Sequence, residues 1–346
     1  MVDNKQTSPL RMGFFGILGL ALWLSPAGAQ TPSWIVPDLL QAAKAEGTLT
    51  IYSSMNEQEG LPLWKKFEEA TGIKTEYVRA NDNAIMARTA IERRAGQRSW
   101  DVIVSTVVSR LPQDYLLAFD PPQAKEIKAQ ARDPNRRWYG VYANYNTPAY
   151  NTKLVKPSEL PKSYEEFATK KEWKGRVAID VTDGHWLNAM YIHYGEEKAK
   201  KIVSDIVANL NPVLTDGHLA MARSVGAGEY MVALNNYASL TSNVKLGGGD
   251  TDYWVLDPVA LFYGQVGVNT QAPHPNAAKL AANYLLSKER QEMLPKAGRL
   301  PVRADVTPNP PDSFKRLESK KVILIQFPGE EEKKWIRLFS DLFKPR

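Results

Sequence analysis

Cysteine is absent from the 346-residue sequence. Disulfide bonds and thiolate chemistry are therefore excluded, and stability must come from a large hydrophobic core. Long apolar runs are also missing after the amino-terminal region: no later segment of the sequence is apolar enough to cross a bilayer.

Signatures of catalysis are equally scarce. The sequence has no G-x-S-x-G elbow, no P-loop and no H-E-x-x-H zinc helix. No pair of carboxylates stands out for acid–base work, and the glycine-rich Leu246–Asp250 indicates a turn. We predict a protein that is not an enzyme and needs no cofactor, with an exported enzyme as an alternative.

The amino terminus has the features of a secretory signal. Lys5 and Arg11 precede the apolar run Met12–Leu24, and the small residues Ala27–Ala29 follow it. A charged start, a short apolar core and an A-x-A site are typical of a cleavable signal peptide. We therefore expect residues 1–29 to be removed, which would leave a freely soluble protein in the periplasm.

The charges of the chain are balanced and well mixed. The formal net charge is +6, with 44 Lys and Arg against 38 Asp and Glu. Positive and negative residues are interspersed along predicted helices, which indicates solvated surfaces. We predict a monomer that binds no nucleic acid and has a mild attraction for anionic ligands.

Two sets of alternating strands and helices follow the amino terminus. The first set consists of strands at 48–54, 73–78 and 101–104 and helices at 60–71 and 83–96, the first of which is expected to stop at Gly72. The second set has strands at 176–181, 211–214 and 230–234, each of which leads into a helix. Alternation of this kind with short links predicts a parallel, doubly wound sheet in each set.

Two aromatic, helix-poor segments, 138–154 and 252–268, are interpreted as strands that cross between the sets. The predicted fold is therefore α/β, with two doubly wound α/β lobes joined by two crossing strands. Lobe 1 is expected to comprise 30–140 and 255–305, lobe 2 to comprise 141–254 and 306–346, and the hinge crossings to lie near 139–150 and 250–262. The cleft between such lobes is the expected place for a ligand, with hinge closure as the expected motion.

Short polar residues gather at the predicted carboxyl ends of the strands, where open α/β sheets bind ligands. In the first set they are Ser53, Ser54, Asn56 and Thr106, and in the second set they are Asp183, Gly184, His185, His218, Asn235 and Tyr237. Ser, Thr, Asn and Asp are also preferred helix N-caps, so capping is the alternative role for those residues. Several helix N-termini around one cleft could bind an anion.

The tetrapeptide T-D-G-H occurs twice, at 182–185 and 215–218, each time at a predicted junction between strand and helix. The aspartate can cap the helix, the glycine allows close approach of a ligand, and the histidine can donate a hydrogen bond or ligate a metal.

Several sequence segments resemble a known family when they are taken in order. They are LTIYSS, FEEATGIKTEYV, WDVIVS, YNTKLV, WKGRVAID, GEYMVALNNY, PHPNAAKLAANYLLSKERQ and GRLPVR. Together they resemble the periplasmic solute-binding proteins of ABC importers, in the branch that includes ferric-ion-binding proteins. The resemblance implies the type II periplasmic binding protein fold, closure on a solute without catalysis, and delivery of the solute to a membrane permease.

The iron ligands of that branch are matched only in part. Its histidine after the first strand corresponds to Met55 and Asn56 here, and its glutamate corresponds to Thr106. Of its adjacent tyrosines only Tyr237 is present, because Ala238 occupies the second position. The anion site of the branch is better matched, by Asp183–His185, Asn235 and a position near His218, although Asp183 would repel an anion unless it caps its helix.

The sequence therefore predicts a binding protein for a small polar, anionic solute such as a carboxylate, phosphate ester or phosphonate. The first alternative is a ferric-ion or other metal-binding transport protein, in which Tyr237 would be the metal ligand.

Overall fold

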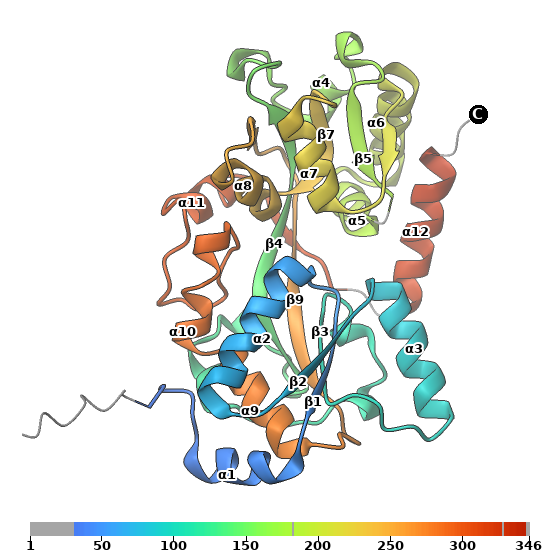
Figure 1. Ribbon diagram of the computed structural model, residues 1–346. Coiled ribbons are helices and arrows are strands. Elements are labelled where there is room, and N and C mark those ends of the chain that lie inside the picture. Colours follow the sequence, from blue (N-terminus) through green and yellow to red (C-terminus); the bar gives the residue numbers. More distant parts are fainter. Residues whose placement is uncertain (1–30, 182, 327–328, 344–346) are drawn as a thin grey trace, which may run out of the picture. The chain divides into compact units, whose positions relative to one another are not determined.

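The computed structural model describes residues 31–181, 183–326 and 329–343 (Figure 1). The predicted signal peptide, 1–29, lies outside the described residues, as does Thr182. Within the described ranges, no helix combines the length and the apolar character that crossing a membrane requires.

Lobe 1 is built on three parallel strands with helices around them. Its elements are β1 (Leu49–Ser53), β2 (Thr75–Arg79), β3 (Val102–Ser105), α1 (Pro37–Glu46), α2 (Glu57–Thr71), α3 (Asp82–Arg94), α9 (Pro275–Leu285), α10 (Lys288–Gln291) and α11 (Ser313–Leu317). Helix α2 buries Leu63, Trp64 and Phe67, which recur at helical spacing on one face. It ends at Gly72, whose φ of 75° is the left-handed conformation that glycine adopts at helix ends, as the sequence predicts.

Lobe 2 repeats the arrangement with strands β5, β6 and β7. Its elements are β5 (Val177–Asp180), β6 (Val213–Thr215), β7 (Val232–Tyr237), α4 (Tyr164–Phe167), α5 (Gly184–Tyr194), α6 (Glu196–Leu210), α7 (His218–Ala227), α8 (Ala238–Leu246) and α12 (Gly329–Phe343). The prediction that the third strand ends at Leu234 is wrong, because β7 continues through Asn235 and Asn236 to Tyr237. Both asparagines are fully buried in the strand, where their amides find hydrogen-bond partners.

Two long strands run between the lobes, as predicted (Figure 1). They are β4 (Trp138–Asn151) and β9 (Val259–Val268), which pair antiparallel at the centre of one sheet of order β2-β1-β3-β9-β4-β7-β5-β6. The short strands β8 (Thr251–Tyr253) and β10 (Val322–Leu324) pair with β4 and β9.

Each lobe has its own hydrophobic core, and β4 contributes to both. Tyr142 and Tyr145 pack in the core of lobe 1, whereas Tyr150 of the same strand packs in the core of lobe 2. Phe339 of α12 belongs to the second core. Leu317 of α11 belongs to the first core, which differs from the expectation that all of 306–346 is part of lobe 2. The carboxyl ends of the parallel strands in both lobes lie next to these crossings, and that is where the site is found.

Candidate functional site

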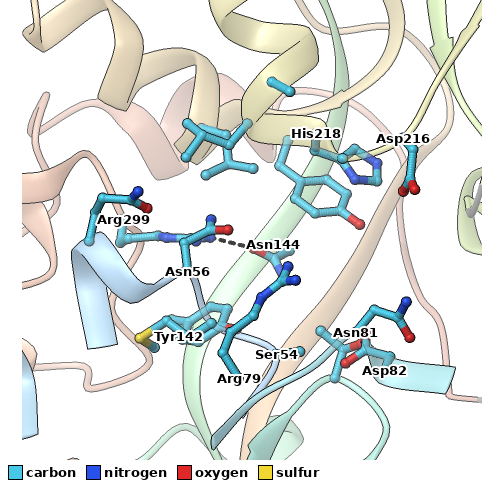
Figure 2. A pocket seen from close by; sticks show the side chains of 18 of the residues that line it. Ser54, Asn56, Arg79, Asn81, Asp82, Tyr142, Asn144, Asp216, His218 and Arg299 are labelled. Atoms are coloured by element: carbon cyan, nitrogen blue, oxygen red, sulfur yellow. Dashed lines mark hydrogen bonds between the residues drawn. The ribbon is translucent and has the colours of Figure 1, made fainter. Parts of the chain in front are cut away.

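A cavity of about 460 Å³ lies where the two lobes and β4 meet (Figure 2). Lobe 1 contributes the loops after β1, β2 and β3, and lobe 2 contributes the starts of α5, α7 and α8. The charged residues of its wall are Arg79, Asp82, Arg110, Asp216, Arg223 and Arg299, in addition to His185 and His218. This volume is within the range of small-molecule binding sites.

Six of the ten residues predicted from sequence line the cavity. They are Ser54, Asn56, Thr106, His185, His218 and Tyr237. The other four, Ser53, Asp183, Gly184 and Asn235, lie behind the wall, and their side chains or backbone support it. Ser53, for example, is buried and its hydroxyl donates to the Val104 carbonyl, tying β1 to β3.

Thr106 is held at the end of β3 by an acidic partner. Its hydroxyl donates to Asp82 Oδ2 over 2.6 Å, and the Ser105 hydroxyl donates to the other oxygen of the same carboxylate. Asp82 begins α3, where a carboxylate also complements the helix dipole. The Asp82 charge in the cavity wall is therefore already engaged by two hydroxyl groups.

His218 is enclosed by two buried aspartates. Its Nδ1 lies 3.6 Å from Asp180 Oδ2 and its Nε2 lies 3.4 Å from Asp183 Oδ2, while its ring stacks on Tyr237 with centroids 3.8 Å apart. Burial lowers the pKa of His218, but the two aspartates outweigh burial and raise the pKa above its ordinary value. Burial, followed by the Asp183 and Asp180 charges, holds the pKa of Tyr237 well above its ordinary value.

His185 connects the two lobes. Arg110 of lobe 1 donates from Nη2 to His185 Nε2 over 3.0 Å, and the imidazole stacks on Phe262 of β9 with centroids 4.3 Å apart. Burial, then the charges of Arg110 and His218, hold the pKa of His185 well below its ordinary value. The neutral ring therefore accepts at Nε2, since the guanidinium can only donate.

At the starts of α5 and α7, buried aspartates of the protein itself accept hydrogen bonds from backbone amides. Asp183 Oδ1 accepts from the Trp186 amide at the start of α5, and Asp180 Oδ2 accepts from the Gly217 amide over 2.7 Å at the start of α7. Asp183 is only 1% exposed. It caps its helix and does not reach the cavity, which corrects its assignment as a ligand-binding residue.

Asn235 also has a structural position that the sequence does not reveal. Its Oδ1 accepts from the Asp180 amide over 2.9 Å and its Nδ2 donates to the Asp180 carbonyl, so one side chain bridges β7 and β5. Asn235 and Asp180 are both fully buried in the interior of lobe 2.

We expect Asn235→Ala to lower the free energy of unfolding of the empty protein by about 2 kcal/mol, because two buried backbone groups lose their partner. Urea denaturation measures the loss. Asn56→Ala is the matched control: Asn56 lines the cavity, makes no capping hydrogen bond and should melt like the parent. Equal stability of the two variants would contradict the bridging role.

The arginines of the wall are absent from the sequence prediction. Arg79 ends β2 and Arg223 lies on α7, and neither makes an ion pair with any residue in the described ranges. Arg299, which follows α10 along the chain, pairs with Glu59 of α2 through two hydrogen bonds of 3.0 and 2.7 Å. Of these arginines, only Arg79 directly follows a predicted strand. It alone could have been identified from the expectation that ligands bind at the carboxyl ends of strands, which is called the strand-end rule below.

The floor of the cavity is formed by β4 and the Arg299 loop. Arg299 Nη1 donates to Asn144 Oδ1 over 3.4 Å, and its guanidinium carbon lies 4.9 Å from the centre of the Tyr142 ring (Figure 2). Tyr142 in turn pairs with Gly264 of β9, and a Cβ at Gly264 would overlap the Tyr142 ring. Burial raises the pKa of Tyr142 above its ordinary value.

The sequence model of one protein family, bacterial extracellular solute-binding protein, matches residues 100–326, which is more than half of the chain. The chain belongs to this family. Members of the family are solute-binding proteins, which agrees with the resemblance noted from the sequence.

This solute-binding protein also resembles individual proteins. It is 27% identical over 199 residues to the iron uptake protein A1 of Synechocystis sp., which covers 54% of this chain and 54% of that protein. The chain thus aligns with about half the length of that relative.

Two solved structures share its fold. Iron-bound HitA of Pseudomonas aeruginosa has a TM-score of 0.72 at 22% identity, covering 86% of this chain and 99% of that one. The periplasmic binding protein AfuA of Actinobacillus pleuropneumoniae, with fructose-6-phosphate bound, has a TM-score of 0.73 at 22% identity, covering 86% and 98%. The predicted type II periplasmic binding fold with two lobes is confirmed.

Proposed function

We propose that this solute-binding protein captures a small anionic solute, a carboxylate, phosphate ester or phosphonate, and delivers it to the permease of an ABC importer. In this proposal the protein works in the periplasm after removal of residues 1–29 and does not alter the solute chemically. The relative AfuA, whose structure contains fructose-6-phosphate, supports a phosphorylated solute within this class.

The observation that carries the proposal is the charge of the cavity wall. Four arginines line the cavity, against two aspartates. The Asp82 carboxylate is engaged by Ser105 and Thr106, whereas Arg79 and Arg223 have no ionic partner in the described part of the chain. Unpaired guanidinium groups in a partly enclosed cavity favour an anionic ligand, because they form strong, directional hydrogen bonds with carboxylate and phosphoryl oxygens.

Native mass spectrometry of the purified protein, followed by thermal shift assays with anionic, neutral and cationic solutes, tests the proposal. We expect an anionic compound to co-purify or to raise the melting temperature by several degrees, since a ligand that binds only the folded state stabilises it. Recovery of the compound unchanged after long incubation supports transport over catalysis. A shift with neutral or cationic solutes alone would refute the proposal.

Ferric iron is the second candidate, because the chain is similar to an iron uptake protein and to an iron-bound protein and because Tyr237 lines the cavity. Against it, Fe(III) favours several anionic oxygen ligands. No cluster of three His, Cys, Asp or Glu suited to a metal occurs within the described ranges. Titration with ferric citrate distinguishes the candidates: a visible tyrosinate–iron band that Tyr237→Phe abolishes would favour iron, and its absence would favour the anionic solute.

A further inference from the structure

The start of α5 is a poor place for the anionic group of a solute. The Asp183 carboxylate already accepts a hydrogen bond from the Trp186 amide in the first turn of α5, and Asp180 accepts from the amide of Gly217, which immediately precedes α7. Both aspartates are buried, at 1% and 0% exposed, so water does not screen them well. An anion brought to the start of α5 would therefore meet acceptor oxygens where it needs donors, whereas the opposite face of the cavity offers donors.

The floor of the cavity offers donors with fixed directions. Arg299 is held by Glu59 and donates to Asn144 Oδ1. Because a guanidinium cannot accept, this contact requires the amide oxygen of Asn144 to face Arg299, and the amide Nδ2 is then turned away from it. These three hydrogen bonds use three of the five guanidinium N–H groups of Arg299, and no residue in the described ranges accepts from the other two.

Tyr142 supplies another donor to the same floor. The residue is 3% exposed and lines the cavity, and its hydroxyl makes no hydrogen bond with a residue in the described ranges. At the cavity wall, this hydroxyl can donate a hydrogen bond to a ligand or to water. Its ring cannot shift toward β9 easily, since it lies directly over Gly264 and beneath Arg299.

Positive charge for an anion on this floor comes from Arg79. The Glu59 carboxylate balances the charge of Arg299. Arg299 therefore contributes N–H donors in fixed directions and little net positive charge. Arg79 extends from the end of β2 into the cavity in the direction of Asn144 (Figure 2). No carboxylate in the described part of the chain forms an ion pair with it.

We propose that the floor made by Tyr142, Asn144 and Arg299, faced by Arg79, is an oxyanion subsite that binds the phosphoryl or phosphonyl group of the solute. Three donors approaching from separate side chains suit a group with three terminal oxygens better than a planar carboxylate with two. This inference rests on the proposed function and adds the place where the anionic group is held.

Isothermal titration calorimetry of the full-length mature protein tests the subsite with glycerol phosphate, methylphosphonate, glycerate and acetate as probes. We expect the phosphorus-containing probe of each pair to bind more tightly than its carboxylate counterpart. Tyr142→Phe should weaken binding of the tighter probe about tenfold or more, as expected for a hydrogen bond to a charged group. Arg79→Met should weaken it similarly and reduce its dependence on salt.

Tyr145→Phe is the matched control for Tyr142→Phe. Tyr145 is three residues along β4, and its hydroxyl donates to Glu318 over 2.8 Å, away from the cavity wall. Tyr145→Phe should lower the melting temperature and keep probe affinity, whereas Tyr142→Phe should keep or raise the melting temperature and lose affinity. This opposite pattern separates a binding role from a structural role.

The outcomes distinguish the subsite from the proposed function. If the unmodified protein binds none of the probes and no other anion, the proposed function itself fails. If it binds a phosphorus-containing probe and Tyr142→Phe and Arg79→Met bind it equally well, the anionic solute stands and the floor subsite is refuted. Tighter binding of the carboxylate probes would also refute the phosphoryl assignment.

Discussion

Gly264→Ala is expected to lower the free energy of unfolding by about 3 kcal/mol and to abolish high-affinity solute binding. The added Cβ would overlap the ring of Tyr142, which is directly paired with Gly264 across β4 and β9. The ring has little room to yield, because it is 3% exposed and lies under the Arg299 guanidinium. Urea denaturation and calorimetry with the co-purified solute measure the two effects.

Gly267→Ala is the matched control on the same strand. A Cβ at Gly267 would meet Val108 and Leu116 at 2.6 and 2.8 Å, in the interior of lobe 1 and outside the cavity wall. Both variants should therefore be destabilised, but only Gly264→Ala should lose solute affinity disproportionately. If Gly264→Ala denatures at the urea concentration of the parent, the Tyr142 ring is not confined as described.

The Glu59–Arg299 pair gives the second large effect. Glu59→Gln should lower the free energy of unfolding at pH 7 by about 3 kcal/mol, because it leaves a buried guanidinium without its counter-charge. The Arg299 side chain is 7% exposed and that of Glu59 is 16% exposed, so solvent compensates little. Asp205→Asn, which breaks the exposed Lys201–Asp205 pair on α6, is the control and should cost at most about 0.5 kcal/mol.

The effect of Glu59→Gln should depend on pH. Burial raises the pKa of Glu59, but the charge and hydrogen bonds of Arg299 outweigh burial, so the pKa in the folded protein is lowered. A lowered folded pKa gives stability that is fully present above the unfolded value, about 4.5, and is lost as the pH falls through the folded pKa. The difference between parent and variant should thus persist at pH 6 and shrink below about pH 4.5. A difference that grows on acidification would contradict the ion pair.

The fold could be predicted from the sequence because the local sequence patterns agree with the arrangement of the strands and helices in the structure. Alternating strands and helices, the helix stop at Gly72 and the two aromatic crossings all correspond to elements of the structure. The error at β7 has a physical cause: Asn235 and Asn236 look like the end of a strand, but buried hydrogen bonds allow both to continue it.

The site was only partly accessible. The strand-end rule found Ser54, Asn56 and Thr106, but it cannot separate a residue that faces the cavity from one that supports the wall, such as Ser53. Arg299 reaches the cavity through a pairing with Glu59 that spans 240 positions of sequence. Two residues so far apart in sequence leave no local pattern that predicts their contact. The donors on β4, Tyr142 and Asn144, leave no such pattern either.

The packing of β4 in the cores of both lobes has a consequence for the rate of solute release. Tyr142 and Asn144 form the cavity floor, and residues of the same strand are anchored in the cores of both lobes. In the hinge motion that we propose, the lobes separate by bending of this strand, so a solute resting on these side chains would contact the segment that bends. Opening and solute release should then share one rate-limiting step, so a stopped-flow record of dissociation should show a single exponential whose rate does not depend on the concentration of competing solute.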